Sequence, residues 1–479
     1  MLINWNFDNS FLNLPKDFYS IVEAEKIPNP EIILYNKSLS SELNINIKNI
    51  KNSTMAEILT GQKKEEKDIY FSQAYAGHQF GYFTILGDGR ALILGEHINK
   101  KNQRFDIQLK GSGKTPYSRQ GDGKATLGSM LREYIVSESM NYLNIPSTRS
   151  LALVLTGENI LREKLDPGAI LIRVAQSHLR VGTFELALYK KNKKNIIDLA
   201  NYSIDRHYPQ LNNSSNKYQQ FFEKVAERQL DLIINWMRVG FIHGVMNTDN
   251  MTITGETIDY GPCAFIDEYL SKKVFSSIDH MGRYSFENQP RIALWNLSRF
   301  AETILFLIDD DEKKAIKKAE LILNKFQEDF HKKWLQMMKT KIGLIENDEK
   351  DKLLITDLLD IMEKNNLDYT NTFVNIQNGE FKNNDFLRNW EKNYKQRKKL
   401  EKKDNKFLNQ LMIKNNPIII PRNHIIEKFI KEAENYNYKN IKLFLDLMKK
   451  TYQNNNDTPD YFKQPPKDNE KVLQTFCGT

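Results

Sequence analysis

The sequence predicts an α+β fold in two lobes, a mixed, strand-rich N-terminal lobe and a larger helical C-terminal lobe. Alternating apolar residues and glycine turns, the pattern of strands, dominate the first part of the chain. From Gly182 onward, apolar residues recur at the spacing of amphipathic helices. With 479 residues, the chain is long enough for a large core and more than one lobe. We therefore expect an N-terminal lobe over 1–180, a helical core over 181–310, and a helical extension with a cysteine-containing tail over 311–479.

Composition indicates a globular protein without a nucleic-acid or membrane partner. Lys and Arg number 69 against 61 Asp and Glu, a net charge of +8, and no single basic face stands out. No apolar run approaches the length of a membrane span, and the N-terminus lacks the layout of a signal peptide. Two cysteines, Cys263 and Cys477, are too few for a disulfide scaffold and fit a reducing compartment. We expect a cytoplasmic monomer.

A glycine turn between two predicted strands offers a place for a phosphate to bind. Residues 75–96 read as strand, turn and strand, and Gly87 and Gly89 lie in the turn. Glycine permits positive φ and lets backbone N–H groups approach a phosphate, while Arg90 adds charge beside them. An ordinary Asp-Gly hairpin contains the same residues, so both interpretations stay open. Upstream, we expect an irregular apolar strap over 1–60 with short helices at 39–50 and 54–59.

A lysine at a strand end and a glutamate on the next helix form a candidate ion pair. Residues 105–110 alternate as a strand that ends at Lys110, and residues 129–143 have helical spacing with Glu133 near the start. In kinases a strand lysine pairs with a helix glutamate and grips phosphates. The alternatives are a solvated lysine and a first-turn glutamate favoured by the helix dipole. Asp122-Gly123, between the two elements, is a further site where backbone can approach a ligand closely.

Two arginines flank the end of another predicted strand. Residues 169–175 form the strand that carries Arg173, and Arg180 follows seven residues later. Guanidinium groups grip phosphate through a planar fork of donors, so the two arginines indicate a phosphate clamp. Solvated surface arginines are the alternative. A buried strand at 151–155 and a turn at 163–168 precede them.

The polar stretch from His243 to Gly261 holds the candidate metal ligands. Asp249 and Asn250 are adjacent, and a short strand at 252–254 with a turn at 255–256 is expected to fold Asp259 back beside them. Carboxylate and carboxamide oxygens suit Mg²⁺ that also binds nucleotide phosphates, as in kinase-like enzymes. A solvated polar turn has the same composition. Helices are expected before this stretch at 184–190, 196–208 and 218–239, and after it near 282 and 294 and over 310–450, with a loop at 454–464.

Together these patterns indicate a bilobal, kinase-like plan with a nucleotide in the cleft. The lysine, the glutamate and the arginines lie in the strand-rich half, and the metal ligands lie in the helical half. An ordinary kinase is not the only reading, because small-molecule kinases usually place an aspartate directly after His-Gly, where this chain has Val245. The carboxylate lies instead at Asp249, next to the metal ligand Asn250.

At the level of motifs the chain resembles the SelO family of protein adenylyltransferases, the protein AMPylases also called the YdiU family. The match is dense over 1–300 and thin afterwards. The motifs that carry it are Trp5-Asn-Phe-Asp-Asn-Ser-Phe, Tyr75-Ala-Gly-His-Gln-Phe-Gly, Gln108-Leu-Lys-Gly-Ser-Gly, Thr115-Pro-Tyr-Ser-Arg, Gly121-Asp-Gly-Lys-Ala, Leu131-Arg-Glu, His243-Gly-Val-Met-Asn-Thr-Asp-Asn-Met, Ile258-Asp-Tyr-Gly-Pro, Phe286-Glu-Asn-Gln-Pro and Leu294-Trp-Asn-Leu, with weaker ones at Asn416-Pro, Pro421-Arg-Asn-His and Cys477-Gly-Thr.

The resemblance implies a pseudokinase-like fold that binds Mg-ATP (or Mn-ATP) inverted and transfers AMP to Ser, Thr or Tyr hydroxyls of other proteins, releasing pyrophosphate. It implies that Asp249 is the proton acceptor, that Lys110 and Glu133 are the ion pair, and that Asn250 and Asp259 are the metal ligands. The implied nucleotide contacts are Gly87, Gly89, Arg90, Lys110, Asp122, Gly123, Arg173, Arg180 and Asp259.

The alternatives are phosphoryl transfer with ordinary nucleotide orientation and an inactive ATP-binding scaffold. Cys263 departs from the family, in which an aromatic residue is expected at this place. Family members commonly carry Cys or selenocysteine at the tail position of Cys477, which raises a regulatory 263–477 disulfide as a hypothesis. The bland alternative is a small buried thiol at Cys263 and a free thiol in a frayed tail.

Overall fold

An antiparallel sheet of eight strands forms one half of the fold. The computed structural model describes residues 3–46, 50–66, 68–381, 385–453 and 458–476. The strand order is β1-β3-β5-β6-β8-β7-β2, and β4 pairs with β3. The strands are β1 Tyr19–Ile21, β2 Glu31–Tyr35, β3 Phe71–Gln79, β4 Tyr82–Gly87, β5 Ala91–Ile98, β6 Arg104–Lys110, β7 Arg149–Leu161 and β8 Leu165–Ala175, with a separate short pair, β9 Phe241–Ile242 and β10 Ala264–Phe265.

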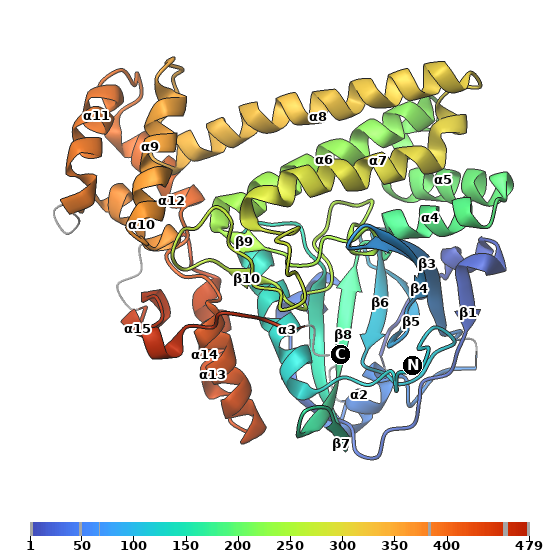
Figure 1. Cartoon of the computed structure of the whole chain (residues 1–479). Helices are drawn as coiled ribbons and strands as arrows, with labels where there is room; N and C mark the ends of the chain where they lie inside the picture. The colour runs from blue at the N-terminus through green and yellow to red at the C-terminus, as the bar shows by residue number, and fades with distance from the viewer. Residues whose placement is uncertain (1–2, 47–49, 67, 382–384, 454–457, 477–479) are drawn as a thin grey trace.

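Helices cover the sheet and make up the C-terminal part of the chain (Figure 1). In the view of Figure 1, α6, α7 and α8 extend above the sheet, and α13 and α14 lie beside α3. Within the described ranges, none of the helices is long and apolar enough to cross a membrane. The helices are α1 Lys37–Glu42, α2 Asn52–Leu59, α3 Leu127–Tyr142, α4 Val181–Tyr189, α5 Lys193–His207, α6 Lys217–Val239, α7 Gln289–Ile308, α8 Glu312–Lys341, α9 Asp351–Lys364, α10 Tyr369–Asn378, α11 Arg388–Lys398, α12 Asn405–Asn415, α13 Asn423–Glu434, α14 Lys439–Met448 and α15 Asp460–Lys463.

The alternation of side chains along β6 decides which residues reach the site. Ile107 and Leu109 are fully buried in an apolar cluster that also contains residues of α1 and α2. Because successive strand residues point to opposite faces, Gln108 and Lys110 turn to the other face of the sheet. That face is covered by α3, from which Glu133 contacts Lys110. The mixed α+β class and the strand ending at Lys110 are therefore confirmed.

The strand expected at 252–254 is not present. Thr252 makes a single bridge with Arg180, and the next residues form a turn. The Thr252 hydroxyl closes this turn, because it donates to the carbonyl of Glu256 and accepts from the N–H of the same residue. Two β-branched threonines favour a strand by propensity, but here a side-chain hydroxyl replaces the partner strand.

Several element boundaries also differ from the sequence-based expectation. The helix expected at 39–50 spans Lys37–Glu42. It begins at Lys37 because the Asn36 side chain caps its start by accepting from the N–H of Leu39. Residues 47–49 lie outside the described ranges. The turn expected at 163–168 is shorter, since β8 already begins at Leu165. The helix expected from 282 begins at Gln289 after a turn. In the loop expected at 454–464, Asp460–Lys463 is a short helix, and 454–457 are not described.

The C-terminal helices are joined to the sheet half by ion pairs. Arg132 on α3 contacts Glu427 on α13 at 2.9 Å. Arg422, which precedes α13 and is 1% exposed, forms ion pairs with Asp267 and with Asp368. Since Asp267 belongs to the segment that follows the site, the helices after residue 310 brace that segment from behind.

Candidate active site

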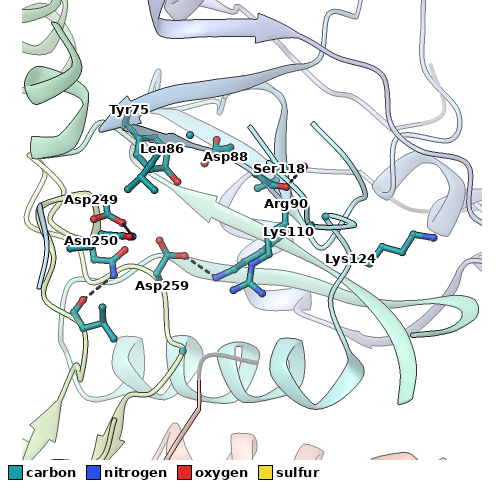
Figure 2. A pocket seen from close by; sticks show the side chains of 18 of the residues that line it. Tyr75, Leu86, Asp88, Arg90, Lys110, Ser118, Lys124, Asp249, Asn250 and Asp259 are labelled. Atoms are coloured by element: carbon teal, nitrogen blue, oxygen red, sulfur yellow. Dashed lines mark hydrogen bonds and ion pairs between the residues drawn. The ribbon is translucent and has the colours of Figure 1, made fainter. Parts of the chain in front are cut away.

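The predicted site residues lie around one cavity of about 680 Å³, a volume typical of small-ligand pockets. Figure 2 shows its walls, formed by β3 to β6 and the loop after β6 on one side and by the segment 245–262 on the other. All predicted nucleotide and metal residues line it; Glu133 does not and lies behind Lys110. The predicted residues in the lining are Gly87, Gly89, Arg90, Lys110, Asp122, Gly123, Arg173, Arg180, Asp249, Asn250 and Asp259.

A cluster of buried charges surrounds Asp259. Lys110 Nζ lies 2.7 Å from Glu133 Oε2 and 2.8 Å from Asp259 Oδ1. Arg173 Nη2 contacts the same two carboxylates, Glu133 at 2.5 Å and Asp259 at 2.7 Å, and Arg180 Nη1 lies 2.8 Å from Asp259 Oδ2. Burial by itself raises the pKa of Asp259, but the three cations hold that pKa well below its usual range. The lysine and the two arginines, expected to meet phosphate, thus converge on one carboxylate.

Local geometry holds Asp259 at this point. Its φ of 62° is in the left-handed region, which a non-glycine residue seldom adopts. The residues before it are fixed to the start of β7, since Thr257 bridges to Ser147 and its N–H donates to the carbonyl of Pro146. Asp259 therefore reaches the site by attachment to the sheet half, and no hairpin with Asn250 is involved.

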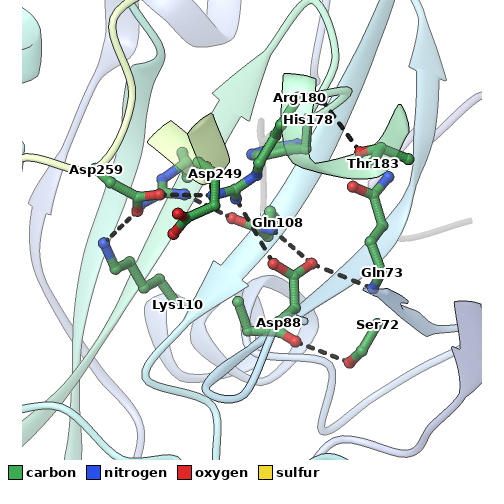
Figure 3. A network of polar contacts seen from close by, with 12 residues as sticks. Ser72, Gln73, Asp88, Gln108, Lys110, His178, Arg180, Thr183, Asp249 and Asp259 are labelled. Atoms are coloured by element: carbon green, nitrogen blue, oxygen red, sulfur yellow. Dashed lines mark hydrogen bonds and ion pairs between the residues drawn. The ribbon is translucent and has the colours of Figure 1, made fainter. Parts of the chain in front are cut away.

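Arg180 and Asp88 link the glycine turn to the charge cluster (Figure 3). Arg180 is 2% exposed, its guanidinium lies over the ring of Tyr75 at 4.5 Å, and its Nη2 is 3.6 Å from Asp88 Oδ1. Gln108 Nε2 donates to Asp88 Oδ2 at 3.2 Å. Sequence reasoning treated Asp88 as a turn residue, yet it is buried, and burial raises its pKa. The hydrophobic strands on both sides of Gly87-Asp-Gly were the signal that this turn is covered.

Asp249 lies in a short 3-10 turn, Thr248–Asn250, at the opposite wall. Burial raises the pKa of the Asp249 carboxyl to about 6, because the effect of burial is larger than that of the Arg180 charge, which lowers this pKa. Its Oδ1 accepts no hydrogen bond from any described residue, and Oδ2 is 3.5 Å from Gln79 Nε2. A buried carboxylate with few hydrogen-bond donors and a pKa near neutrality is suited to accept a proton.

Asn250 and Asp259 offer oxygen ligands on the same cavity. Asn250 Nδ2 donates to the carbonyl of Val245 at 2.9 Å, which leaves its Oδ1 on the other side of the amide (Figure 2). Across the described ranges, no group of three His, Cys, Asp or Glu side chains could hold a metal ion alone. One carboxamide and one carboxylate nevertheless fit Mg²⁺, which usually takes one or two protein ligands and completes its shell with water and phosphate oxygens.

The second glycine site is a close backbone approach. Gly123 has φ of 69°, and a Cβ there would meet the carbonyl oxygen of Gly113 at 2.0 Å, so only glycine fits. The neighbouring Asp122 is held by Arg162 through two contacts of 2.8 and 2.9 Å. Arg162 and Lys124, which also line the cavity, were not identified from the sequence. Lys124 directly follows Gly123, which was the signal available for it, whereas Arg162 lies in the turn between β7 and β8, where no such signal exists.

Cys263, two residues after the cavity residue Gly261, has no exposed surface. Thr475, near the chain end, donates to the carbonyl of Pro262 at 2.6 Å, so the tail passes beside this segment. Cys477, the other member of the hypothetical disulfide, lies outside the described residues.

Glu256 gives the segment between Asn250 and Asp259 a pH-dependent stability. The carboxylate accepts from the N–H of Gln176 and from the hydroxyl of Thr254, and burial raises the pKa of Glu256 to about 7 from its usual 4.5. Between pH 4.5 and about pH 7, the Glu256 carboxyl is protonated in the folded state and ionised in the unfolded chain. The contribution of Glu256 to the free energy of unfolding is therefore full below pH 4.5 and declines up to about pH 7.

We expect Glu256→Gln to reduce this decline, because a neutral amide has no charge to bury. One pKa unit corresponds to about 1.4 kcal/mol, so the drop in unfolding free energy between pH 5 and pH 8 should shrink by on the order of 1–3 kcal/mol. Urea unfolding at both pH values measures it, with the exposed Glu287→Gln as control. Equal pH dependence in wild type and Glu256→Gln would contradict the assignment.

Comparison with known proteins assigns this chain to the nucleotidyltransferases. The family model described as protein adenylyltransferase SelO matches residues 1–452. A Pelagibacter ubique protein named protein nucleotidyltransferase YdiU is 48% identical over the full length of both chains. Proteins of the same name from Clostridium perfringens and Brevibacillus brevis are 46% and 47% identical over 99% of this chain and 98% of theirs. The chain belongs to the SelO family, and the resemblance seen in its motifs is confirmed.

Proposed function

We propose that this enzyme transfers AMP from Mg-ATP to Ser, Thr or Tyr hydroxyls of proteins, within a bilobal, kinase-like architecture. The observation that carries the proposal is the cavity with buried cations on one wall and the Asp249 carboxylate, which few hydrogen bonds hold, on the other. A nucleotide triphosphate carries negative charge that the cations match, and an attacking hydroxyl needs a base within hydrogen-bond reach. The family membership favours a nucleotidyl group over a phosphoryl group.

The residues around the cavity have separate roles in the proposed transfer of AMP. The acceptor hydroxyl oxygen attacks the α-phosphorus, its proton passes to Asp249, and the bond from that phosphorus to the oxygen that bridges to the β-phosphate breaks, so that pyrophosphate leaves. Lys110, Arg173 and Arg180 hold phosphate oxygens, and Glu133 fixes the first two cations in place. A divalent cation on Asn250 and Asp259 would neutralise further phosphate charge.

The glycine turns fit the rest of the nucleotide. The backbone at Gly87, Gly89 and Gly123 lines the cavity, where it can contact phosphate or ribose. Arg90 and Asp122 lie beside them on the cavity wall. The α-phosphate then faces Asp249, and we take the inverted nucleotide orientation from the resemblance to the SelO family.

The position of the label in ATP tests the proposal. The purified chain, with dephosphorylated casein as acceptor, is incubated with Mg²⁺ and ATP labelled at the α- or the γ-phosphate. We expect only the α-label on protein, pyrophosphate in solution, and transfer by Asp249→Asn that is slower by about 10²–10⁴-fold. Transfer of the γ-label alone would establish the kinase alternative, and transfer of neither label would leave an ATP-binding scaffold.

A further inference from the structure

The motif Tyr75–Gly81 at the end of β3 has no part in the proposed chemistry, yet it runs along the segment that carries Asp249. One edge of β3 pairs with β4 from Ala74 to Gln79. The N–H of His78 donates to Thr248 Oγ1 at 2.7 Å, and the N–H of Phe80 donates to Asn247 Oδ1 at 3.1 Å. Side chains of Asn247 and Thr248 therefore accept hydrogen bonds from the backbone in the last residues of β3 and just after it.

Asp249 itself packs directly on this strand. A Cβ at Gly77 would lie 2.5 Å from Asp249 Oδ1 and 2.8 Å from its Cβ. Any side chain at position 77 would consequently displace the carboxylate. On the opposite side, a Cβ at Gly182, at the start of α4, would meet the carbonyl of Ala76 at 1.9 Å. Two glycines thus allow β3, α4 and the Asp249 segment to come into backbone contact.

Glu185 on α4 closes a ring of hydrogen bonds around Thr248. The Thr248 hydroxyl accepts from the N–H of His78 and donates to Glu185 Oε2 at 2.5 Å. The other oxygen of the same carboxylate, Oε1, is 2.5 Å from His78 Nδ1. Thr248 has no exposed surface and Glu185 is 4% exposed. The ring fixes Thr248 from two elements at once, one residue before Asp249.

A general base needs such indirect support because its own oxygens must stay available to the substrate. Asp249 has one long contact, from Gln79, on Oδ2, and within the described residues no donor on Oδ1. Its direction is therefore set by its neighbours in the chain and by its backbone, whose carbonyl accepts from Arg180 Nη1 at 2.8 Å.

We propose that His78, Thr248 and Glu185 are positioning residues for Asp249, and that Gly77 provides the space its carboxylate occupies. The proposal rests on the proposed role of Asp249 as proton acceptor. None of the three residues touches the reacting atoms; they hold the turn from which Asp249 reaches them. A displacement of about 1 Å at a reacting group can cost on the order of 10²-fold in rate.

Thr248→Val tests the ring, because valine keeps the shape of threonine and removes the hydroxyl. We expect the rate of α-label transfer to casein at saturating ATP to fall about 10- to 100-fold, with the ATP concentration for half-maximal rate nearly unchanged. Thr248→Ser, which restores a hydroxyl, should recover most of the rate. Thr254→Val, which removes a buried hydroxyl from the same segment outside the ring, is the matched control and should keep the wild-type rate.

Gly77→Ala is the second variant and should lose at least as much rate while still binding ATP, measured by calorimetry. A structural role alone would lower the melting temperature of Thr248→Val and leave the rate per folded molecule unchanged, which would overturn the proposal. The double variant Asp249→Asn with Thr248→Val should be no slower than Asp249→Asn, because a positioning residue has nothing left to position.

These outcomes separate the two proposals. A wild-type rate in Asp249→Asn would show that Asp249 is not the proton acceptor, which would refute the role that the proposed function gives to this carboxylate. A strongly slowed Asp249→Asn together with a wild-type rate in Thr248→Val and Gly77→Ala would leave the base in place and end the positioning proposal. Independent, multiplying losses in the double variant would also end it, since Thr248 would then act on something other than Asp249.

Discussion

Asp259→Asn is expected to abolish nucleotide transfer in a chain that still folds. Asparagine keeps the shape of the side chain and removes the negative charge that faces Lys110, Arg173 and Arg180. The three cations then repel one another and lose their common partner, and the proposed metal site loses its carboxylate. Loss of a preorganised charge at a reacting centre costs about 2.7–4 kcal/mol, and two functions are lost here, so we expect a rate reduction of at least about 10³-fold.

The structure changes what this substitution should do to stability. From the sequence alone, a polar cleft residue is expected to contribute little to folding. The ion pairs contradict that expectation, because removal of one member of a buried charge cluster typically costs about 3–5 kcal/mol. We therefore expect a lower melting temperature along with the lost activity. Transfer of α-label is measured per folded molecule, with Asp166→Asn, a sheet aspartate paired with Lys164 outside the cavity, as control. Wild-type transfer by folded Asp259→Asn would refute the assignment.

Local patterns in the sequence predicted much of the secondary structure. The alternation over residues 105–110 predicted a strand that ends at Lys110, and β6 confirms it, because the alternation of side chains in a strand is a local property. The long amphipathic repeat predicted at 218–239 corresponds to α6, Lys217–Val239. The turn at 252–256 was missed because its threonine hydroxyl closes on the backbone of Glu256, which propensity does not register.

The contacts between distant segments were beyond local patterns. Asp259 meets Lys110 across 149 residues, and Glu185 meets Thr248 across 63. Sequence reasoning named the charged residues because their types suit phosphate and metal, but charge type does not reveal partners. The bracing of the site by the C-terminal helices, through Arg422 and Asp267, was not foreseen for the same reason.

The second large effect is expected from the two cations that share Glu133. Arg173 donates through Nε and Nη2 to Glu133 and through Nη1 to Gln108, and it also contacts Asp259. Lys110 reaches the same two carboxylates with one ammonium group. Arg173 is thus fixed by three side chains and Lys110 by two.

Because a guanidinium fork and an ammonium group hold phosphate differently, neither cation can replace the other. Lys110→Ala and Arg173→Ala should each reduce α-label transfer by roughly 10²–10³-fold, the equivalent of about 2.7–4 kcal/mol. Arg173→Ala should in addition lower the melting temperature more, since it leaves Glu133 and Gln108 short of donors in a buried place. The control is Lys64→Ala, a surface lysine paired with Glu23. If both cleft variants transfer label at the wild-type rate, these side chains only stabilise Asp259 and Glu133, and the phosphates must bind elsewhere in the cavity.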